Sequence, residues 1–172
     1  LRQLKKVGSA FSAVANILQS QQVASQPTTV AVGALLGSVR TTAKQKGIGL
    51  HVDAPETLQS TVYASDLGYI CHVLLENALQ FTKEGGRVTV VFRDSASRLS
   101  LLVRDTGVGI APEKLNGLMQ PFVRATSTET YDYEGLGLSL YTVRLLVERY
   151  GGAITMTSTP DVGTTVSVVF KK

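Results

Sequence analysis

Three short motifs between residues 72 and 138 constrain this chain more than any other feature. The first, Val-Leu-Leu-Glu-Asn-Ala-Leu-Gln-Phe-Thr at 73–82, has the apolar spacing of a helix. The second, Asp-Thr-Gly-Val-Gly-Ile at 105–110, directly follows an apolar, strand-like segment. The third, Gly-Leu-Gly-Leu at 135–138, opens another helical segment. A single Gly-x-Gly carries little information, but three motifs in this order, each on a suitable element, limit the chain to few folds.

Hydrophobic periodicity predicts helices and strands in alternation. Gly47 and the pair at 151–152 follow helical segments, as glycine commonly does at helix ends, and Asp66 is expected to cap another helix. Pro112 is expected to open a short helix. The expected helices are 30–46, 66–81 and 136–150, and the expected strands are 48–52, 59–63, 87–93, 98–104, 153–158 and 164–170. This order predicts an α/β (α+β) two-layer sandwich, with three helices covering one face of a mixed β-sheet.

Composition excludes several classes of protein. The longest apolar run, 30–36, is far too short to span a membrane, and a hydrophobic fraction of 44% is ordinary for a globular domain. Cys71 is the single cysteine, so no internal disulfide can form. Its place on the apolar side of a helix predicts a small buried residue rather than a reactive thiol. The net charge of +4 comes without a Lys/Arg run, so we do not expect nucleic-acid binding.

The first 26 residues are expected to form a separate helical element that ends before Pro27. Its apolar residues repeat at spacings of three, four and seven, typical of a narrow helical seam: Leu1, Leu4, Phe11, Val14 and Leu18. Two interpretations stay open, a helix packed on its own domain and the end of a dimerisation helix. The start at a residue other than Met favours a fragment of a longer protein. We therefore expect a dimerisation-helix end or linker at 1–26 and one domain at 27–172.

Together the motifs resemble the N box and the two glycine boxes of the catalytic ATP-binding domain of sensor histidine kinases, the HATPase_c or Bergerat-fold domain. The resemblance covers roughly residues 30–170. It implies the Bergerat ATP-binding fold, with ATP and Mg²⁺ as ligands and phosphoryl transfer to a histidine as the activity. It further implies a homodimeric full-length protein, a response regulator as partner, and a cytoplasmic location, either free or as the cytoplasmic part of a membrane-anchored sensor.

The acceptor histidine is expected outside this chain. In the family it stands on a helix and is typically followed by Glu or Asp. His51 lies on an expected strand before Val52, and His72 precedes Val73, so neither matches. The acceptor is therefore expected upstream, on a dimerisation and phosphoacceptor domain. Phosphoryl transfer is mostly positioning and charge neutralisation, so this domain would supply ATP and Mg²⁺.

In the first motif, the resemblance assigns Asn77 as the Mg²⁺ ligand, since its neutral oxygen suits an ion that prefers few protein ligands. Gln80 stands where the family usually has a basic residue. The missing charge-assisted bond to phosphate, worth about 1.5–3 kcal/mol, would weaken ATP binding by roughly ten- to a hundredfold. Lys83, also assigned to the site, and Arg87 are candidates to compensate.

The spacing of the 66–82 helix predicts two faces. The buried stripe is expected to contain Leu67, Ile70, Leu74, Ala78 and Phe81, and the other face Val73, Asn77, Gln80 and Glu84. Bergerat ATPases that hydrolyse ATP, such as gyrase and the heat-shock chaperone of ninety kilodaltons, have a Glu general base four residues before the Asn. Val73 stands there and cannot accept a proton, while Glu76 points about 100° away around the helix. We therefore assign no catalytic residue and expect no activation of water.

In the second motif, the resemblance assigns Asp105 as the adenine selector. Its carboxylate would accept a hydrogen bond from the adenine amino group, a donor that guanine does not offer at that position. Gly107 and Gly109 would let the backbone approach the base, and Ile110 completes the segment. Asp-Thr-Gly-Val-Gly-Ile matches the family pattern at every position.

The third motif is expected at the phosphates, because free N–H groups and the helix dipole at a helix start suit anions. Its residues are Gly135, Leu136, Gly137 and Leu138. The family usually has another glycine where this chain has Tyr133, so the chain departs from the family pattern at the expected phosphate contacts. Between the glycine boxes, Gln-Pro-Phe-Val-Arg resembles the F box, with Phe122 and Arg124 as candidate nucleotide contacts. The polar stretch after it is expected to form a lid over ATP.

Three hypotheses follow. The first is the ATP-binding catalytic domain of a sensor histidine kinase. The second is a degenerate module that binds nucleotide weakly or not at all and regulates a partner, and the departures at Val73, Gln80 and Tyr133 favour it. The third is a free-standing Bergerat kinase or ATPase, against which the missing base and the N-terminal seam argue.

Overall fold

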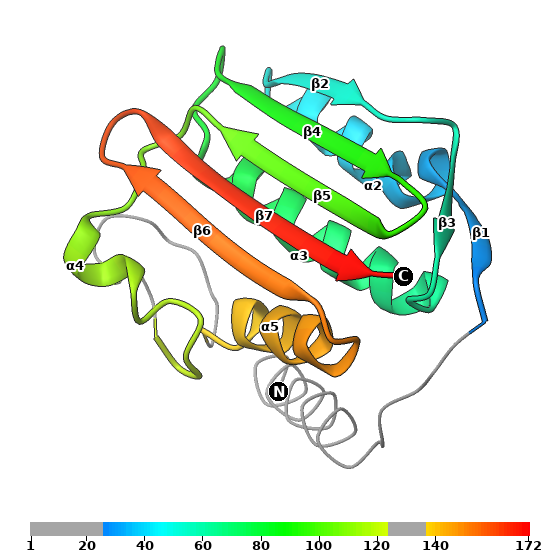
Figure 1. Ribbon diagram of the computed structural model, residues 1–172. Coiled ribbons are helices and arrows are strands. Elements are labelled where there is room, and N and C mark those ends of the chain that lie inside the picture. Colours follow the sequence, from blue (N-terminus) through cyan, green and yellow to red (C-terminus); the bar gives the residue numbers. More distant parts are fainter. Residues whose placement is uncertain (1–25, 124–136) are drawn as a thin grey trace, which may run out of the picture.

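The computed structural model describes residues 26–123 and 137–172, which form a five-stranded sheet, a two-stranded ribbon and four helices (Figure 1). The sheet order is β2-β4-β5-β7-β6, and the ribbon pairs β1 with β3. β2 runs parallel to β4, and every other neighbouring pair is antiparallel. The elements are β1 (Thr28–Ala31), α2 (Val32–Gln45), β2 (Gly49–Asp53), β3 (Thr57–Ser60), α3 (Ala64–Phe81), β4 (Arg87–Asp94), β5 (Arg98–Asp105), α4 (Pro112–Leu115), α5 (Ser139–Arg149), β6 (Ala153–Thr159) and β7 (Gly163–Lys171).

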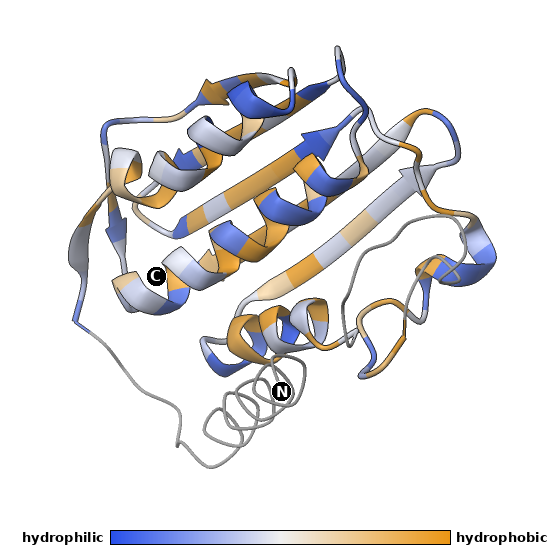
Figure 2. Cartoon of the chain, turned by 180° about the vertical axis from the view of Figure 1, so that it is seen from behind, coloured by the Kyte–Doolittle hydropathy of each residue, from blue (hydrophilic) through white to orange (hydrophobic). Residues whose placement is uncertain are grey.

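The core lies between the sheet and three helices. Figure 2 shows α2, α3 and α5 lying across the same face of the sheet. Strands β4 and β5 alternate, so that Val88, Val90 and Phe92 point to the helices and are fully buried. From the helix side, residues such as Leu36 and Ile70 are equally buried. The expected mixed sheet under three helices is therefore confirmed.

Helix α3 is buried more widely than its sequence pattern predicted. It lies between α2 and α5 on the sheet, so apolar residues outside the expected stripe also face neighbours (Figure 2). Val73 is only 8% exposed and belongs to the core, whereas Phe81, expected inside, is half-buried. Val73 was expected outside the buried stripe but is buried, although it stands one turn before the half-buried Asn77 on the same side of the helix.

The N-terminal part of the domain differs from prediction. The expected helix at 30–46 begins only at Val32, because Thr28–Ala31 pairs with Thr57–Ser60 as a ribbon. The strand expected at 59–63 is thus this shorter β3, outside the main sheet. Val30 of β1 and Leu58 of β3 are buried in the core. Burial of these two side chains stabilises the ribbon beside the helices.

Two helix starts also differ. Tyr63 is the N-cap residue of α3, and no side chain caps it. Asp66 lies inside the first turn, where its carboxylate accepts a hydrogen bond from the Tyr150 hydroxyl at 2.5 Å. Helix α5 begins at Ser139 rather than at 136. Pro112 opens α4 as predicted, since its fixed φ suits the first helical position.

Cys71 is fully buried, and burial raises the pKa of its thiol to about 12, which confirms the expectation of an unreactive side chain. Within 26–123 and 137–172, no helix is both long and apolar enough to cross a bilayer. The helix expected before Pro27 lies outside the described residues, as does most of the expected lid.

Candidate functional site

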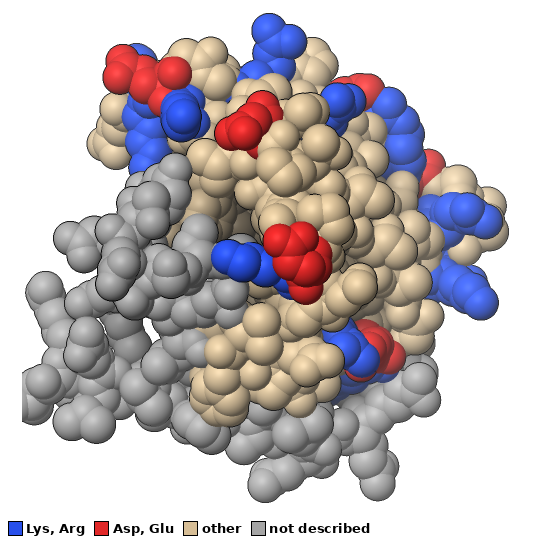
Figure 3. All heavy atoms as spheres, turned by 90° about the vertical axis from the view of Figure 1, so that its left-hand side faces the viewer, with Lys and Arg blue, Asp and Glu red and all other residues tan. Residues whose placement is uncertain are grey.

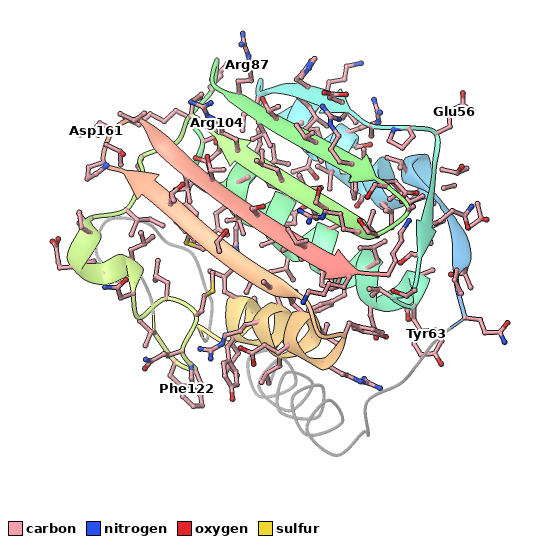
Figure 4. All side chains as sticks on the ribbon, in the orientation of Figure 1. Glu56, Tyr63, Arg87, Arg104, Phe122 and Asp161 are labelled. Carbon is pink, nitrogen blue, oxygen red and sulfur yellow. The ribbon has the colours of Figure 1, made fainter. Side chains whose placement is uncertain are left out.

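Segments that are distant in the sequence meet at one end of the sheet. The carboxyl end of α3, the start of β4, the end of β5 and the β6–β7 turn lie there (Figure 1). Arg87, Arg104 and Asp161 mark this end in Figure 4. Figure 3 looks onto it and shows a hollow among uncharged residues, with a basic and an acidic side chain at its lower edge. The fold therefore brings the first and second motifs together.

Asp105 ends β5 and is 8% exposed. Its Oδ1 accepts hydrogen bonds from the backbone N–H groups of Gly107, at 2.8 Å, and of Thr164, at 3.2 Å. Burial raises the pKa of Asp105, and these two donors offset only part of that effect. Both bonds end on Oδ1, so no described residue donates to Oδ2. One oxygen thus fixes the carboxylate, and the other can accept a bond from a ligand.

The two glycines of the second motif are required by packing inside the protein. A Cβ on Gly107 would clash with the carbonyl oxygen of Phe81, at the end of α3. Gly109 has a φ of 65°, and a Cβ there would clash with the carbonyl oxygen of Thr159. The loop is thus pressed between α3 and the β6–β7 turn. This is a second reason for glycine besides close approach to a base.

A serine that the sequence did not single out connects the second motif to β6 and β7. Ser158 Oγ accepts a hydrogen bond from the Ile110 N–H at 2.8 Å and lies 2.9 Å from the Gly163 carbonyl oxygen. It also lies 2.8 Å from Thr164 Oγ1. Thr164 in turn donates its N–H to Asp105. No local pattern marks Ser158, because its partner Ile110 is 48 positions away.

Two polar side chains of the first motif have no hydrogen-bond partner among the described residues. Asn77 and Gln80 are half-buried on α3, and neither side chain has a hydrogen bond to any described residue. Lys83 is exposed just beyond the helix. Glu84 lies over Gly47 instead, so it leaves the face on which it was expected. In the described ranges, no three His, Cys, Asp or Glu residues gather as a metal cluster.

The third motif is only partly described. Gly137 has a φ of 67°, and its carbonyl oxygen accepts the Phe122 N–H at 3.1 Å. Leu138 is buried at the start of α5, where its carbonyl oxygen accepts two bonds from Thr142. Arg124, Tyr133, Gly135 and Leu136 lie outside the described residues.

Phe122 does not join the Asp105 end of the site. Its side chain is 60% exposed, and its φ is 66°. Figure 4 shows it at the outer edge of the loop between α4 and α5, pointing away from the sheet. Its expected nucleotide contact stays a prediction.

Comparisons with known proteins show which proteins this chain is similar to. A family model described as histidine kinase-, DNA gyrase B-, and HSP90-like ATPase matches residues 63–172. An uncharacterized sensor-like histidine kinase of Rhizobium meliloti is 44% identical over 95 residues, which are 55% of this chain and 18% of that protein. Histidine protein kinase DivJ of Caulobacter vibrioides is 37% identical over 139 residues, 80% of this chain and 23% of that protein.

The fold has solved counterparts as well. The crystal structure of full-length ShkA in complex with AMPPNP matches with a TM-score of 0.72 at 22% identity, over 94% of this chain and 35% of that one. The chain spans about a fifth of the length of the curated relatives it matches. It belongs to the histidine kinase-, DNA gyrase B- and HSP90-like ATPase family, as a catalytic domain of the sensor histidine kinase type.

Proposed function

We propose that this domain binds Mg-ATP at the Asp105 end of the sheet and presents the γ-phosphate to a histidine on an upstream dimerisation domain. The observation that carries the proposal is the Asp105 carboxylate, which has one oxygen fixed by two N–H groups and the other without a donor among the described residues. Oδ2 would accept the adenine amino group, and guanine offers no such donor there. The family of the chain supports ATP as the nucleotide.

The side chains of the first motif fit the metal and phosphate end. Asn77 offers a neutral oxygen without a described protein partner, which suits Mg²⁺, an ion that keeps water and phosphate oxygens as its main ligands. Bound with the nucleotide, Mg²⁺ supplies positive charge that neutralises phosphate oxygens. Gln80 and Lys83 would face the phosphates, with Lys83 as the cationic member. Residues 135–138 would donate N–H groups at the start of α5.

The same geometry argues against hydrolysis by this domain. Val73 is buried and carries no proton acceptor, so no base stands four residues before Asn77. Transfer would then require a nucleophile from elsewhere, which we assign to the upstream histidine. Residues 1–26 would be the end of that dimerisation helix. The full-length protein would act as a homodimer in the cytoplasm, where ATP is available, and would pass the phosphoryl group to a response regulator.

Calorimetric titration of AMPPNP with Mg²⁺ into the wild-type chain and Asp105→Asn tests the proposal. Asn keeps an acceptor at Oδ1 but replaces Oδ2 by a donor, so affinity should fall about ten- to a hundredfold. The preference for adenine over guanine nucleotide should shrink with it. Asp53→Asn is the control, because Asp53 is exposed and paired with Arg93 on β4.

Two outcomes would contradict the proposal. Equal affinity of wild type and Asp105→Asn would remove Asp105 from the site. No binding to the wild type up to several millimolar nucleotide would favour the regulatory module over the kinase.

A further inference from the structure

The face of the five-stranded sheet opposite α2, α3 and α5 is uncovered by any described helix (Figure 1). Strand register places its outward side chains in rows across the sheet. One row contains Thr89, Arg104 and Thr165, and the next contains Val91, Leu102 and Ser167. These valine and leucine side chains are half-buried. We call this surface the open face.

The open face carries the whole net charge of the chain. Its basic residues are Arg87, Arg93, Arg98, Arg104 and Lys171, and its one acidic residue is Asp53. These are five of the 17 Lys and Arg and one of the 13 Asp and Glu, so the remaining chain is balanced with twelve of each sign. In profile, at the right of Figure 3, basic side chains dominate this face. The formal charge of +4 is therefore concentrated on one flat surface.

The basic residues of this face are poorly neutralised within the domain. Asp53 pairs with Arg93 at 2.5 Å, and no other ion pair forms on this face among the described residues. Arg98 and Lys171 lie directly opposite each other on neighbouring strands. Like charges in that position cost stability. An approaching negative surface would relieve this repulsion.

The chemistry of the face selects one class of partner. Four of its five basic residues are arginines, whose planar groups bind carboxylates in a bidentate way and are common in protein interfaces. No Phe, Tyr or Trp occupies an outward position on the five described strands, and His51 of β2 is the one ring there on which a base could stack. Its larger apolar residues are half-buried and so offer little exposed surface for insertion into a membrane. An acidic protein surface fits best.

We propose that the open face is a docking surface for an acidic face of a folded partner protein. Five strands about 4.8 Å apart and about eight residues long give roughly 500 Å². An interface of that size, about 1,000 Å² for both partners, is typical of transient contacts rather than permanent assemblies. The proposal is tested away from the nucleotide site, because Asp105 and Asn77 lie on the helix side and the Arg98–Lys171 pair lies at the other end of β5 and β7 from Arg104.

The test uses the 172-residue chain labelled with ¹⁵N, with poly-L-glutamate as the anionic polypeptide probe. Vesicles of phosphatidylcholine with phosphatidylserine and single-stranded DNA are the competing probes. Arg98→Glu/Lys171→Glu reverses the charge of a like-charged cross-strand pair, so internal repulsion stays similar. Arg40→Glu/Lys44→Glu is the matched control, a like-charged pair on exposed positions of α2. AMPPNP binding is measured for each variant, so failure of the nucleotide site is seen separately.

We expect poly-L-glutamate to shift amide resonances on β4, β5 and β7, with affinity falling at higher salt. The open-face variant should bind it about tenfold more weakly, while the α2 variant changes by less than about twofold. Both should retain AMPPNP binding. If the open-face variant unfolds, Arg98→Gln/Lys171→Gln repeats the measurement without new charges. Equal weakening by both pairs, shifts confined to the helix side, or tighter binding to vesicles or DNA than to polyglutamate would overturn the proposal.

Discussion

The candidate site has two ends that differ in structure. We call the end at Asp105 and the 105–110 loop the base end, and the end at Asn77 and Gln80 of α3 the phosphate end. At the base end, Asp105 Oδ1 accepts two backbone N–H groups, and the Ile110 N–H is bonded to Ser158. None of these bonds needs a ligand. At the phosphate end, the Asn77 and Gln80 side chains have no hydrogen-bond partner among the described residues. Under the proposed function, the base end is organised before binding, whereas the polar side chains of the phosphate end would gain their partners from metal and phosphate.

The largest effect should come from disturbing the base end. In Gly109→Ala, the new Cβ would collide with the Thr159 carbonyl oxygen at a positive φ. The loop must move, so we expect a loss of about 2–4 kcal/mol in the free energy of unfolding. AMPPNP binding should fall by at least about a hundredfold.

Chemical denaturation and calorimetry measure the two effects. Gly33→Ala on α2 is the control, since a Cβ there meets nothing within 4 Å and helical alanine is favourable. Unchanged nucleotide affinity in Gly109→Ala would mean that the base end adapts, and the comparison between the two ends would fail.

At the phosphate end, a substitution should change nucleotide affinity only when Mg²⁺ is present. Asn77→Ala should lower affinity for AMPPNP in the presence of Mg²⁺ by about ten- to a hundredfold, the usual range for losing a partner in a metal site. Affinity without Mg²⁺ should hardly change. Glu76→Ala is the neighbouring control, because its side chain points about 100° away around the helix. Equal losses with and without Mg²⁺ would contradict the metal role.

The contrast between the ends also explains what sequence reasoning could reach. Strands β4 and β5 were predicted within one residue, because their alternating pattern reflects direct burial on one face. Asp105 and its two glycines are recognisable because one short segment contains all three. The contribution of Ser158 is not, since its bond to Ile110 depends on how distant strands meet.

Similar long-range causes account for the errors in the fold. The ribbon strand Thr28–Ala31 pairs with residues near position 58, and without that partner an apolar run beginning at Val30 resembles a helix. Val73 was expected outside the buried stripe, but α3 has helices on both sides, so a second stripe is buried. Local spacing describes one helix face, and packing decides how many faces are covered.

A smaller effect should come from restoring a charge at the phosphate end. Gln80→Lys puts a cation on the face of α3 next to the expected phosphates, so AMPPNP affinity should rise by about tenfold. Gln45→Lys adds the same charge at an exposed position at the end of α2 and is the control. An equal rise in both variants would indicate general attraction of the nucleotide, and no rise in Gln80→Lys would place Gln80 away from the phosphates.

The smallest effect concerns stability and pH. Burial raises the pKa of Asp105, so its favourable contribution to folding is complete below the ordinary value of 3.8 and is lost as pH rises through the raised pKa. At neutral pH the ionised carboxylate therefore destabilises the apo domain, and Asp105→Asn should unfold at a higher denaturant concentration than wild type. That advantage should vanish toward pH 4.

Asp94 provides the opposite sign. Burial raises the pKa of Asp94, but the hydrogen bond from the Gln59 N–H and the charge of Lys172 together lower it by more. The net pKa is therefore depressed. Its contribution is present above 3.8 and is lost as pH falls through the depressed pKa, so Asp94→Asn should be less stable than wild type at neutral pH. Parallel unfolding curves from pH 4 to pH 8 separate the two variants. If Asp105→Asn instead lost stability at neutral pH, the ionised Asp105 carboxylate would stabilise the fold. The base end would then carry no loss of folding stability for nucleotide binding to offset.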